Sequence, residues 1–200
     1  RYTREAAEHF CPWNSKAPRI IPVATSFGLE DECAKIKSFP TILLGLYNEN
    51  LIKAACGIRS KSDGYFSQVY CKEDIEKIIL KSENISHCKV CEIVNLVSTG
   101  PMASIKLVKE LNKFYLSQNI DYAIFSGSEN LRVFLKLLGL DVVEICTAEQ
   151  SKIENPSDWG SYYETNPTVC YARKPNISHS LIFKNLKKLQ KNVKFSHITQ

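Results

Sequence analysis

Apolar and polar positions along residues 90–146 follow two periods that alternate along the chain. Three short runs are almost continuously apolar, which is typical of buried strands. These runs are residues 90–97, 122–125 and 142–146. The segments between them, residues 102–118 and 129–138, repeat apolar side chains at three- and four-residue spacing, as amphipathic helices facing a sheet do. The pattern predicts strand, helix, strand, helix and strand, with polar turns at 98–101 and 126–128.

Further apolar runs on both sides extend this prediction to one sheet. Residues 41–47 and 51–59 are split by a polar tripeptide, which indicates a hairpin. Gly57, near the end of the second run, indicates a bulge or a close backbone approach. Residues 168–172 form a last short strand. Because residues 90–97 are apolar on both faces, we expect that strand inside the sheet and covered on both sides.

The remaining segments define the domain organisation. Residues 72–81 have helical periodicity, and Glu73 and Lys77 are spaced for an ion pair on that helix. Prolines interrupt residues 1–38, so that segment predicts no regular element. We therefore expect a single α/β domain over residues 39–174, with a mixed central β-sheet flanked by helices.

The positive charge is concentrated at one end of the chain. Residues 175–200 hold five of the 26 basic residues and none of the 21 acidic ones, so the rest of the chain is neutral. A neutral body does not favour nucleic-acid binding. Apolar residues recur at helical spacing between these lysines, which predicts a basic amphipathic helix suited to an anionic membrane surface or an acidic protein. The alternative is a terminal helix packed on the domain with its lysines in solvent.

Most of the eight cysteines lie inside apolar runs, where free cysteine behaves as a small hydrophobic residue. We therefore expect a reduced, cytoplasmic setting. Cys88 and Cys91 have the spacing of half a zinc site or of a redox pair, but no second such pair accompanies them, so no metal site is predicted. No apolar run reaches the roughly 20 residues that span a bilayer, and no signal peptide is visible. Because Arg1 is not a native start, secretion stays open.

Small polar residues follow the predicted strands at their carboxyl ends. Turns and helix N-termini present backbone N–H groups there, and ligands bind at such places in alternating α/β sheets. The residues concerned are Ser98, Thr99, Gly100, Ser126, Ser128 and Asn130. We expect them to bind a carbonyl or phosphate group. The alternative for the last three is ordinary capping of the helix that follows.

Glu92 is the one charged residue in the apolar run of residues 90–97. A carboxylate is costly to bury there unless it is paired or faces a cleft, and desolvation raises its pKa into the range of a general base. The alternative is a structural ion pair, for example with Arg59. Asn95 lies on the opposite face of a regular strand, but a bulge between the two residues would bring both to one pocket.

Four amphipathic aromatic residues are candidates for the wall of a binding pocket. They are Tyr70, Trp159, Tyr162 and Tyr163. Their rings combine an apolar body with a polar tip, which suits an acyl or aromatic substrate, although packing of the final strand explains the last three equally well. The four histidines lie far apart along the chain and belong to no recognisable triad or ligand motif.

Several of these segments also stand out as sequence motifs. They are Cys-Glu-Ile-Val-Asn-Leu at residues 91–96, Phe-Ser-Gly-Ser-Glu-Asn-Leu-Arg at 125–132 with Leu-Gly-Leu at 138–140, Trp-Gly-Ser-Tyr-Tyr-Glu at 159–164 with Asn-Pro-Thr-Val at 166–169, and Tyr-Phe-Ser-Gln-Val-Tyr at 65–70. Together they resemble the bacterial thermostable haemolysin family over roughly residues 40–174. The tryptophan-to-proline segment is the most distinctive part of the resemblance.

That resemblance implies a fold similar to GNAT-type acyltransferases and acyl-homoserine-lactone synthases. GNAT enzymes hold the coenzyme A pyrophosphate with a glycine-rich loop that also carries an arginine or glutamine. Here the corresponding residues 98–103 contain one glycine and no basic residue. We therefore do not expect coenzyme A to bind in the usual manner, and an acyl-phosphopantetheine arm on an acyl-carrier protein is the alternative donor.

These observations favour an acyltransferase-like enzyme that moves an acyl group from a thioester donor, acyl-CoA or acyl-carrier protein, to a small amine or other nucleophile. Glu92 would be the base, the two turns would bind the donor, and the aromatic residues would shape the acceptor pocket. No covalently bound cofactor is expected. Two alternatives remain: a membrane-active haemolysin that uses the lysine-rich tail, and a non-catalytic binding module that kept the fold.

Overall fold

The computed structural model describes residues 19–20, 34–35, 40–48 and 51–173. In the N-terminal part it contains two short strands, β1 (Arg19–Ile20) and β2 (Ala34–Lys35), which pair antiparallel. The predicted lysine-rich helix of residues 175–200 lies outside the described residues, as does most of the segment 1–38.

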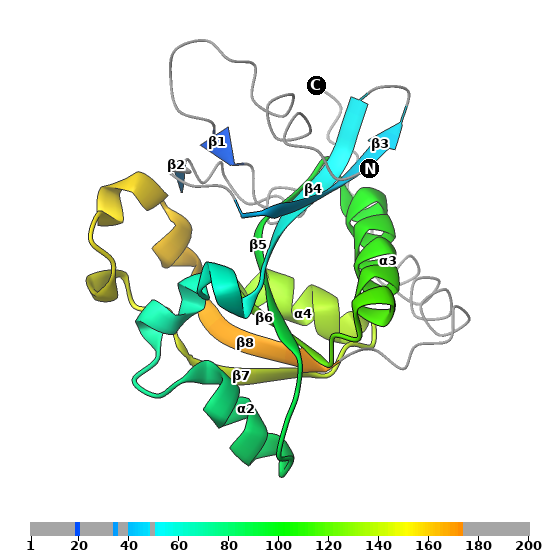
Figure 1. Cartoon of the computed structure of the whole chain (residues 1–200). Coiled ribbons are helices and arrows are strands. Elements are labelled where there is room, and N and C mark those ends of the chain that lie inside the picture. The colour runs from blue at the N-terminus through cyan, green and yellow to red at the C-terminus, as the bar shows by residue number, and fades with distance from the viewer. Residues whose placement is uncertain (1–18, 21–33, 36–39, 49–50, 174–200) are drawn as a thin grey trace.

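The main sheet has six strands in the order β3-β4-β5-β6-β8-β7 (Figure 1). Its strands are β3 (Ile42–Asn48), β4 (Leu51–Arg59), β5 (Val90–Ser98), β6 (Tyr122–Gly127), β7 (Val142–Thr147) and β8 (Thr168–Arg173). All neighbours are antiparallel except β5 and β6, which are parallel. The predicted mixed sheet and the predicted hairpin of β3 and β4 are confirmed. The strongly apolar strand β5 lies inside the sheet, as expected.

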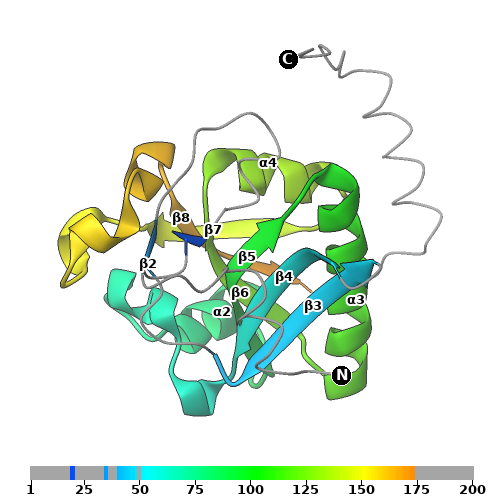
Figure 2. The same cartoon turned by 90° about the horizontal axis from the view of Figure 1, so that it is seen from above.

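Helices cover both faces of the sheet, which explains why β5 is apolar on both sides. Side chains of α3 (Pro101–Gln118) and α4 (Glu129–Leu137) form one core with β4 and alternate residues of β5. On the other face, α2 (Ile75–Glu83) and the 3-10 helix η3 (Phe66–Tyr70) pack on Val90, Ile124 and β8. Viewed from above, the β3–β4 hairpin and α3 lie side by side at one end of the molecule (Figure 2).

Two local expectations were wrong. Residues 126 and 127 belong to β6 and not to a turn, because both pair with β8. The helix predicted over residues 72–81 begins only at Ile75, since the Asp74 side chain accepts the Lys77 N–H and caps it. Glu73 therefore lies before the helix and pairs with Lys81 instead of Lys77.

Strands β5 and β6 pair over only three residues of each strand, from Val90↔Tyr122 to Glu92↔Ile124. Beyond that point, among the described strands, β5 pairs with β4 alone and β6 pairs with β8 alone. The two central strands therefore part directly after Glu92. The candidate residues at their carboxyl ends follow this point of separation.

A β-bulge lies in β5 where the strands part. Ala55 pairs with Val97 and Gly57 pairs with Val94, so β5 has one residue more than β4 in this interval. Asn95 takes up the extra length with a φ of 52°, a left-handed conformation that asparagine tolerates better than most residues. The bulge considered for Glu92 and Asn95 is thus present. Gly57 opposite it makes the predicted close approach, because an added Cβ would lie 2.2 Å from Pro40 Cγ.

We predict that Gly57→Ala lowers the free energy of unfolding by about 1–3 kcal/mol, because the new methyl group overpacks the contact with buried Pro40 and with Val94. Urea unfolding monitored by fluorescence measures this change. Gly100→Ala is the matched control, since an added Cβ there meets nothing within 4 Å. Equal stability of the two variants would contradict the close packing at Gly57.

Candidate active site

Glu92 is the most deeply buried carboxylate at the point where β5 and β6 part. The residue is only 1% exposed. Its Oε2 accepts the Phe66 N–H at 2.6 Å, and its Oε1 accepts the Ser67 N–H at 2.7 Å and the Ser67 hydroxyl at 2.5 Å. Both carboxylate oxygens are therefore occupied by donors from η3.

Burial raises the pKa of the Glu92 carboxyl above its ordinary value. The hydrogen bonds from Ser67 and Phe66 and the positive charge of Arg59 act in the opposite direction and limit the increase. A carboxylate with a raised pKa holds a proton more firmly than an exposed one, and this is the property that a general base near neutral pH requires.

Arg59 lies directly opposite Glu92 in the antiparallel register of β4 and β5. Among the described residues, its hydrogen bond is to the Asp63 carbonyl at 3.4 Å, and its buried Nε has no partner. The considered alternative of an Arg59–Glu92 ion pair is therefore present only as a nearby charge. The hydrogen bonds that satisfy Glu92 come from η3.

Ser67 connects Glu92 to the neighbouring strand. It is fully buried, and its Oγ lies 2.9 Å from Ser126 Oγ on β6. A continuous polar chain therefore runs from Glu92 on β5 through Ser67 on η3 to the half-buried Ser126. Sequence reasoning missed Ser67, although it lies inside the Tyr-Phe-Ser-Gln-Val-Tyr motif that carried part of the resemblance.

The predicted turn after β5 uses much of its polarity to hold itself in place. Ser98 Oγ donates to the Gly100 carbonyl at 2.8 Å and accepts the Gly100 N–H at 3.1 Å. The Thr99 N–H and hydroxyl both donate to the Lys53 carbonyl on β4, at 2.8 and 3.1 Å. Gly100 begins α3 without a side-chain cap, and the space beside its Cα is open.

The second predicted turn divides between different roles. Ser128 is the N-cap of α4 and accepts the Leu131 N–H at 3.4 Å, in agreement with the capping alternative. Asn130 is exposed on the first turn of α4. Ser126 alone contacts the chain that leads to Glu92. The structure therefore does not bring the three residues together around one ligand position.

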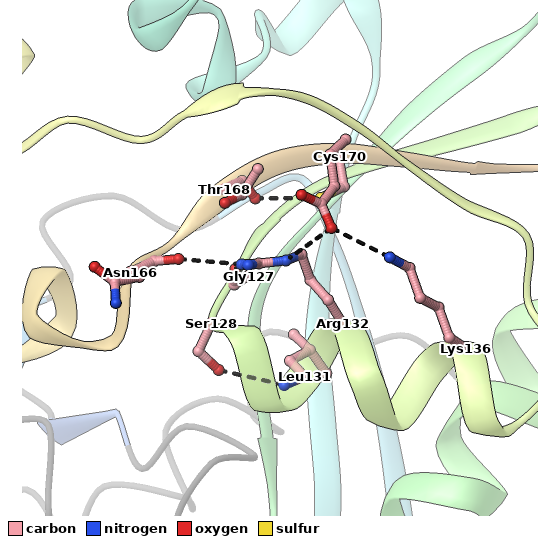
Figure 3. A network of polar contacts seen from close by, with 9 residues as sticks. Gly127, Ser128, Leu131, Arg132, Lys136, Asn166, Thr168 and Cys170 are labelled. Carbon is pink, nitrogen blue, oxygen red and sulfur yellow. Dashed lines mark hydrogen bonds and ion pairs between the residues drawn. The ribbon is translucent and has the colours of Figure 1, made fainter.

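Arg132 fixes the position of this turn. Figure 3 shows Arg132 and Lys136 projecting from α4 toward the strand that carries Cys170. Arg132 Nη1 donates to the Gly127 carbonyl at 2.8 Å and to the Asn166 carbonyl at 3.1 Å. Its Nε and the Lys136 ammonium both pair with Glu144 on β7, at 3.3 and 3.2 Å. These contacts attach α4 to the end of β6 and to β7.

The four predicted aromatic residues lie together, joined by Phe66. The Tyr70 and Tyr163 hydroxyls are 2.6 Å apart, and Trp159 stacks on Phe66 with a ring separation of 5.1 Å. Tyr162 contacts both Trp159 and Tyr163. We call Phe66, Tyr70, Trp159, Tyr162 and Tyr163 the aromatic cluster. Because the Phe66 N–H binds Glu92, the aromatic cluster is adjacent to the buried carboxylate.

The two hydrogen-bonded phenols of the aromatic cluster remain protonated at neutral pH. Burial and the bond to Tyr163 raise the pKa of Tyr70, and burial also raises the pKa of Tyr163. They can therefore donate or accept hydrogen bonds but are poor bases. Asn95 is half-buried at the bulge, and its side chain has no hydrogen-bond partner among the described residues.

Within the described part of the chain, no three histidine, cysteine, aspartate or glutamate residues cluster closely enough to hold a metal ion. No helix of that part is long and apolar enough to cross a membrane. The six cysteines described there are free.

The fold and the buried carboxylate at the parted strands are similar to what solved acyl-transfer proteins contain at the level of architecture. FeeM, an N-acyl amino acid synthase from uncultured soil microbes, matches with a TM-score of 0.52 and 16% identity over 88% of this chain and 95% of that chain. TofI, solved with an inhibitor and MTA, gives 0.53 and 9% over 78% and 77%. The AHL synthase LasI gives 0.50 and 7% over 72% and 69%. These likenesses concern the fold, and they confirm the predicted GNAT-like α/β class.

The family follows from the sequence itself. The family model described as Thermostable hemolysin matches residues 27–177, and the chain belongs to this family. No curated protein matches the chain.

We predict that Ser128→Ala lowers the free energy of unfolding by about 1 kcal/mol, because the first turn of α4 loses its cap. Asn130→Ala, two residues further on an exposed surface, leaves stability nearly unchanged. Chemical unfolding of both variants measures the difference. An unchanged stability of Ser128→Ala would contradict the capping role and favour a ligand-binding role for this hydroxyl.

Proposed function

We propose that the protein is an acyltransferase that moves an acyl group from a thioester donor to a small amine, with Glu92 as the base. The observation that carries this proposal is the raised pKa of a buried carboxylate beside two parting central strands. The shared fold supports it, because FeeM is an N-acyl amino acid synthase and LasI is an AHL synthase.

The chemistry explains why such a carboxylate is needed. A small aliphatic amine is protonated at neutral pH, since an ordinary alkylammonium group has a pKa of about 10.4. It must lose a proton before its nitrogen can attack the thioester carbonyl. The new C–N bond then forms and the C–S bond breaks, which releases the thiol of the donor. A base with a pKa near the working pH accelerates this deprotonation by about 10²–10⁴-fold.

The start of α3 is the proposed position of the donor. Gly100 leaves open space there, and the N-terminus of the helix offers backbone N–H groups to an anion. Pro101 removes one of these donors, and residues 98–103 contain no basic side chain. A single phosphate, as on a phosphopantetheine arm, suits this place better than the diphosphate of coenzyme A. The bulge at Asn95 leaves ladder groups of β5 unpaired beside it.

The aromatic cluster is the proposed wall of the acceptor site. Its rings are half-buried or buried and combine apolar faces with phenol hydroxyls. An amino acid or another small amine with an apolar side chain fits such a surface. The printed name of FeeM supports amino acids as the first acceptors to test.

We predict that Glu92→Gln lowers kcat by roughly 10²-fold or more, because the base is lost. The assay incubates long-chain acyl-carrier protein with the standard amino acids and measures N-acyl products by mass spectrometry. Glutamine places an amide NH₂ among the Phe66 and Ser67 donors, so some loss of stability accompanies the loss of turnover.

Glu83→Gln is the matched control for this experiment. Glu83 is also a largely buried carboxylate, but it pairs with Arg173, and its hydrogen bonds lower its pKa. Its replacement costs stability and leaves turnover per folded molecule unchanged. Equal turnover by wild type, Glu92→Gln and Glu83→Gln would show that Glu92 is structural. A wild-type protein that binds acyl donors without product would favour the non-catalytic binding module.

A further prediction concerns the donor. We expect free acetyl-coenzyme A to bind weakly and an acylated carrier protein to bind more tightly, with an affinity that falls as salt increases, since charged surfaces meet in that complex. Isothermal calorimetry at two ionic strengths compares them. Salt-insensitive, low-micromolar binding of the free coenzyme would contradict this assignment and indicate a conventional coenzyme A site.

A further inference from the structure

Glu92 is placed where it has no direct access to a substrate. Only 1% of the residue is exposed, and three donors from η3 occupy its two carboxylate oxygens. An amine cannot reach these oxygens without displacing Phe66 or Ser67. If Glu92 accepts the proton of an acceptor, as the proposed function requires, the proton has to pass through another group.

The number of hydrogens on Ser67 determines the direction of its two contacts. A serine hydroxyl donates one hydrogen and accepts through its lone pairs. An ionised carboxylate only accepts, so the hydrogen of Ser67 Oγ points to Glu92 Oε1. In the second contact Ser67 must then be the acceptor, and the hydrogen comes from Ser126 Oγ.

Ser126 is therefore left with free lone pairs and no free hydrogen. It is half-buried at the end of β6, and among the described residues its side chain bonds to Ser67 alone. A group of this kind accepts a hydrogen bond from an N–H or O–H donor and offers nothing to a carbonyl or a carboxylate. The chain ends, in chemical terms, at a position for an ammonium group.

We propose that Ser126 receives the acceptor amine and that Ser67 passes the proton from Ser126 to Glu92. This proposal rests on the proposed acyl transfer. Ser126 is the residue that contacts the substrate, and Ser67 is a positioning and proton-passing residue. The acceptor is accordingly an amine that reaches the site as an ammonium ion, with its N–H directed at Ser126 Oγ.

The proton movements balance in this scheme. The ammonium gives a proton to Ser126 Oγ, Ser126 gives its own hydrogen to Ser67 Oγ, and Ser67 gives its hydrogen to Glu92 Oε1. The neutral amine forms the C–N bond as the C–S bond of the thioester breaks. The second amine proton goes to the departing thiolate, and Glu92 returns its proton to solvent by the reverse path. Both serines end with the hydrogens they need for the next turnover.

The surroundings hold Ser67 in position for this role. Next to it, Gln68 Oε1 accepts the Ile75 N–H at 3.0 Å, and Gln68 Nε2 donates to the Glu73 carbonyl at 3.0 Å. On the other side, Phe66 is stacked against Trp159. η3 is thereby fixed to α2 and to the aromatic cluster, so Ser67 keeps both contacts without a costly reorganisation.

Titration of Glu92 tests the chain without any assay of activity. The carboxyl carbon of Glu92 is followed by NMR in protein labelled at glutamate, and Glu92→Gln assigns its signal. Ser67→Ala should raise the pKa of Glu92, because a hydrogen bond that favours the ionised form is lost. Ser126→Ala should raise it less. An unchanged pKa in Ser67→Ala would show that the chain does not exist in solution.

The dependence of turnover on pH tests the transfer itself. In the wild type, kcat/KM should increase with pH through the pKa of Glu92 and then level off, because the base must be ionised. Ser126→Ala should lose roughly 10²-fold in kcat and lose this step, since the amine then depends on solvent for deprotonation. Ser126→Thr keeps a hydroxyl and should recover both the rate and the pH step.

Ser128→Ala is the control, because it removes a hydroxyl two residues away that caps α4 and has no contact with Glu92. It should lower stability and keep the pH profile. Full kcat and an unchanged pH step in Ser126→Ala, beside an inactive Glu92→Gln, would overturn this route while acyl transfer stands. A wild type that acylates no amine overturns the proposed function and this route together, whatever the titration shows.

Discussion

The burial of Glu92 is the constraint on which the rest of the site depends. An ionised carboxylate in the interior is tolerated only when hydrogen bonds replace the lost water. Two backbone N–H groups and one hydroxyl of η3 supply that replacement. Because those donors belong to consecutive residues, η3 has to lie against β5 in one orientation. The aromatic cluster depends on the same placement, since Phe66 and Tyr70 are part of η3.

The second constraint is the separation of β5 and β6. Their parallel pairing ends at Glu92, and the bulge at Asn95 follows within three residues. Bulges bend a strand and increase its local twist, so the bulge directs β5 toward β4 and away from β6. The costly charge and the opened sheet therefore occur at one place. Ser67 and Ser126 connect the two strands where backbone hydrogen bonds no longer do.

The electrostatics of the described carboxylates distinguish this place from the rest of the surface. Contacts with Arg173 and with Lys136 lower the pKa of Glu83 and of Glu144, respectively. Those residues fix distant segments together: Glu83 attaches α2 to β8, and Glu144 attaches β7 to α4. Glu92 has its pKa raised instead, because no cation contacts it directly and burial dominates. Structural ion pairs and a reactive carboxylate thus differ in the direction of the shift.

The sequence by itself determined the elements and the buried position of Glu92. Apolar periodicity reports which side chains avoid water, so it predicted the hairpin, the strands and the two long helices, and it marked a single charge in residues 90–97 as unusual. It also indicated the aromatic residues, through the family resemblance. Only the tertiary structure decided the partners: Ser67 lies 25 positions from Glu92 and 59 from Ser126, inside a short 3-10 helix without a periodic signal. It likewise assigned Ser128 to capping and Thr99 to a bond with Lys53. Such contacts depend on strand register and on one inserted residue at Asn95, and these are set by pairing between distant segments that no local pattern contains.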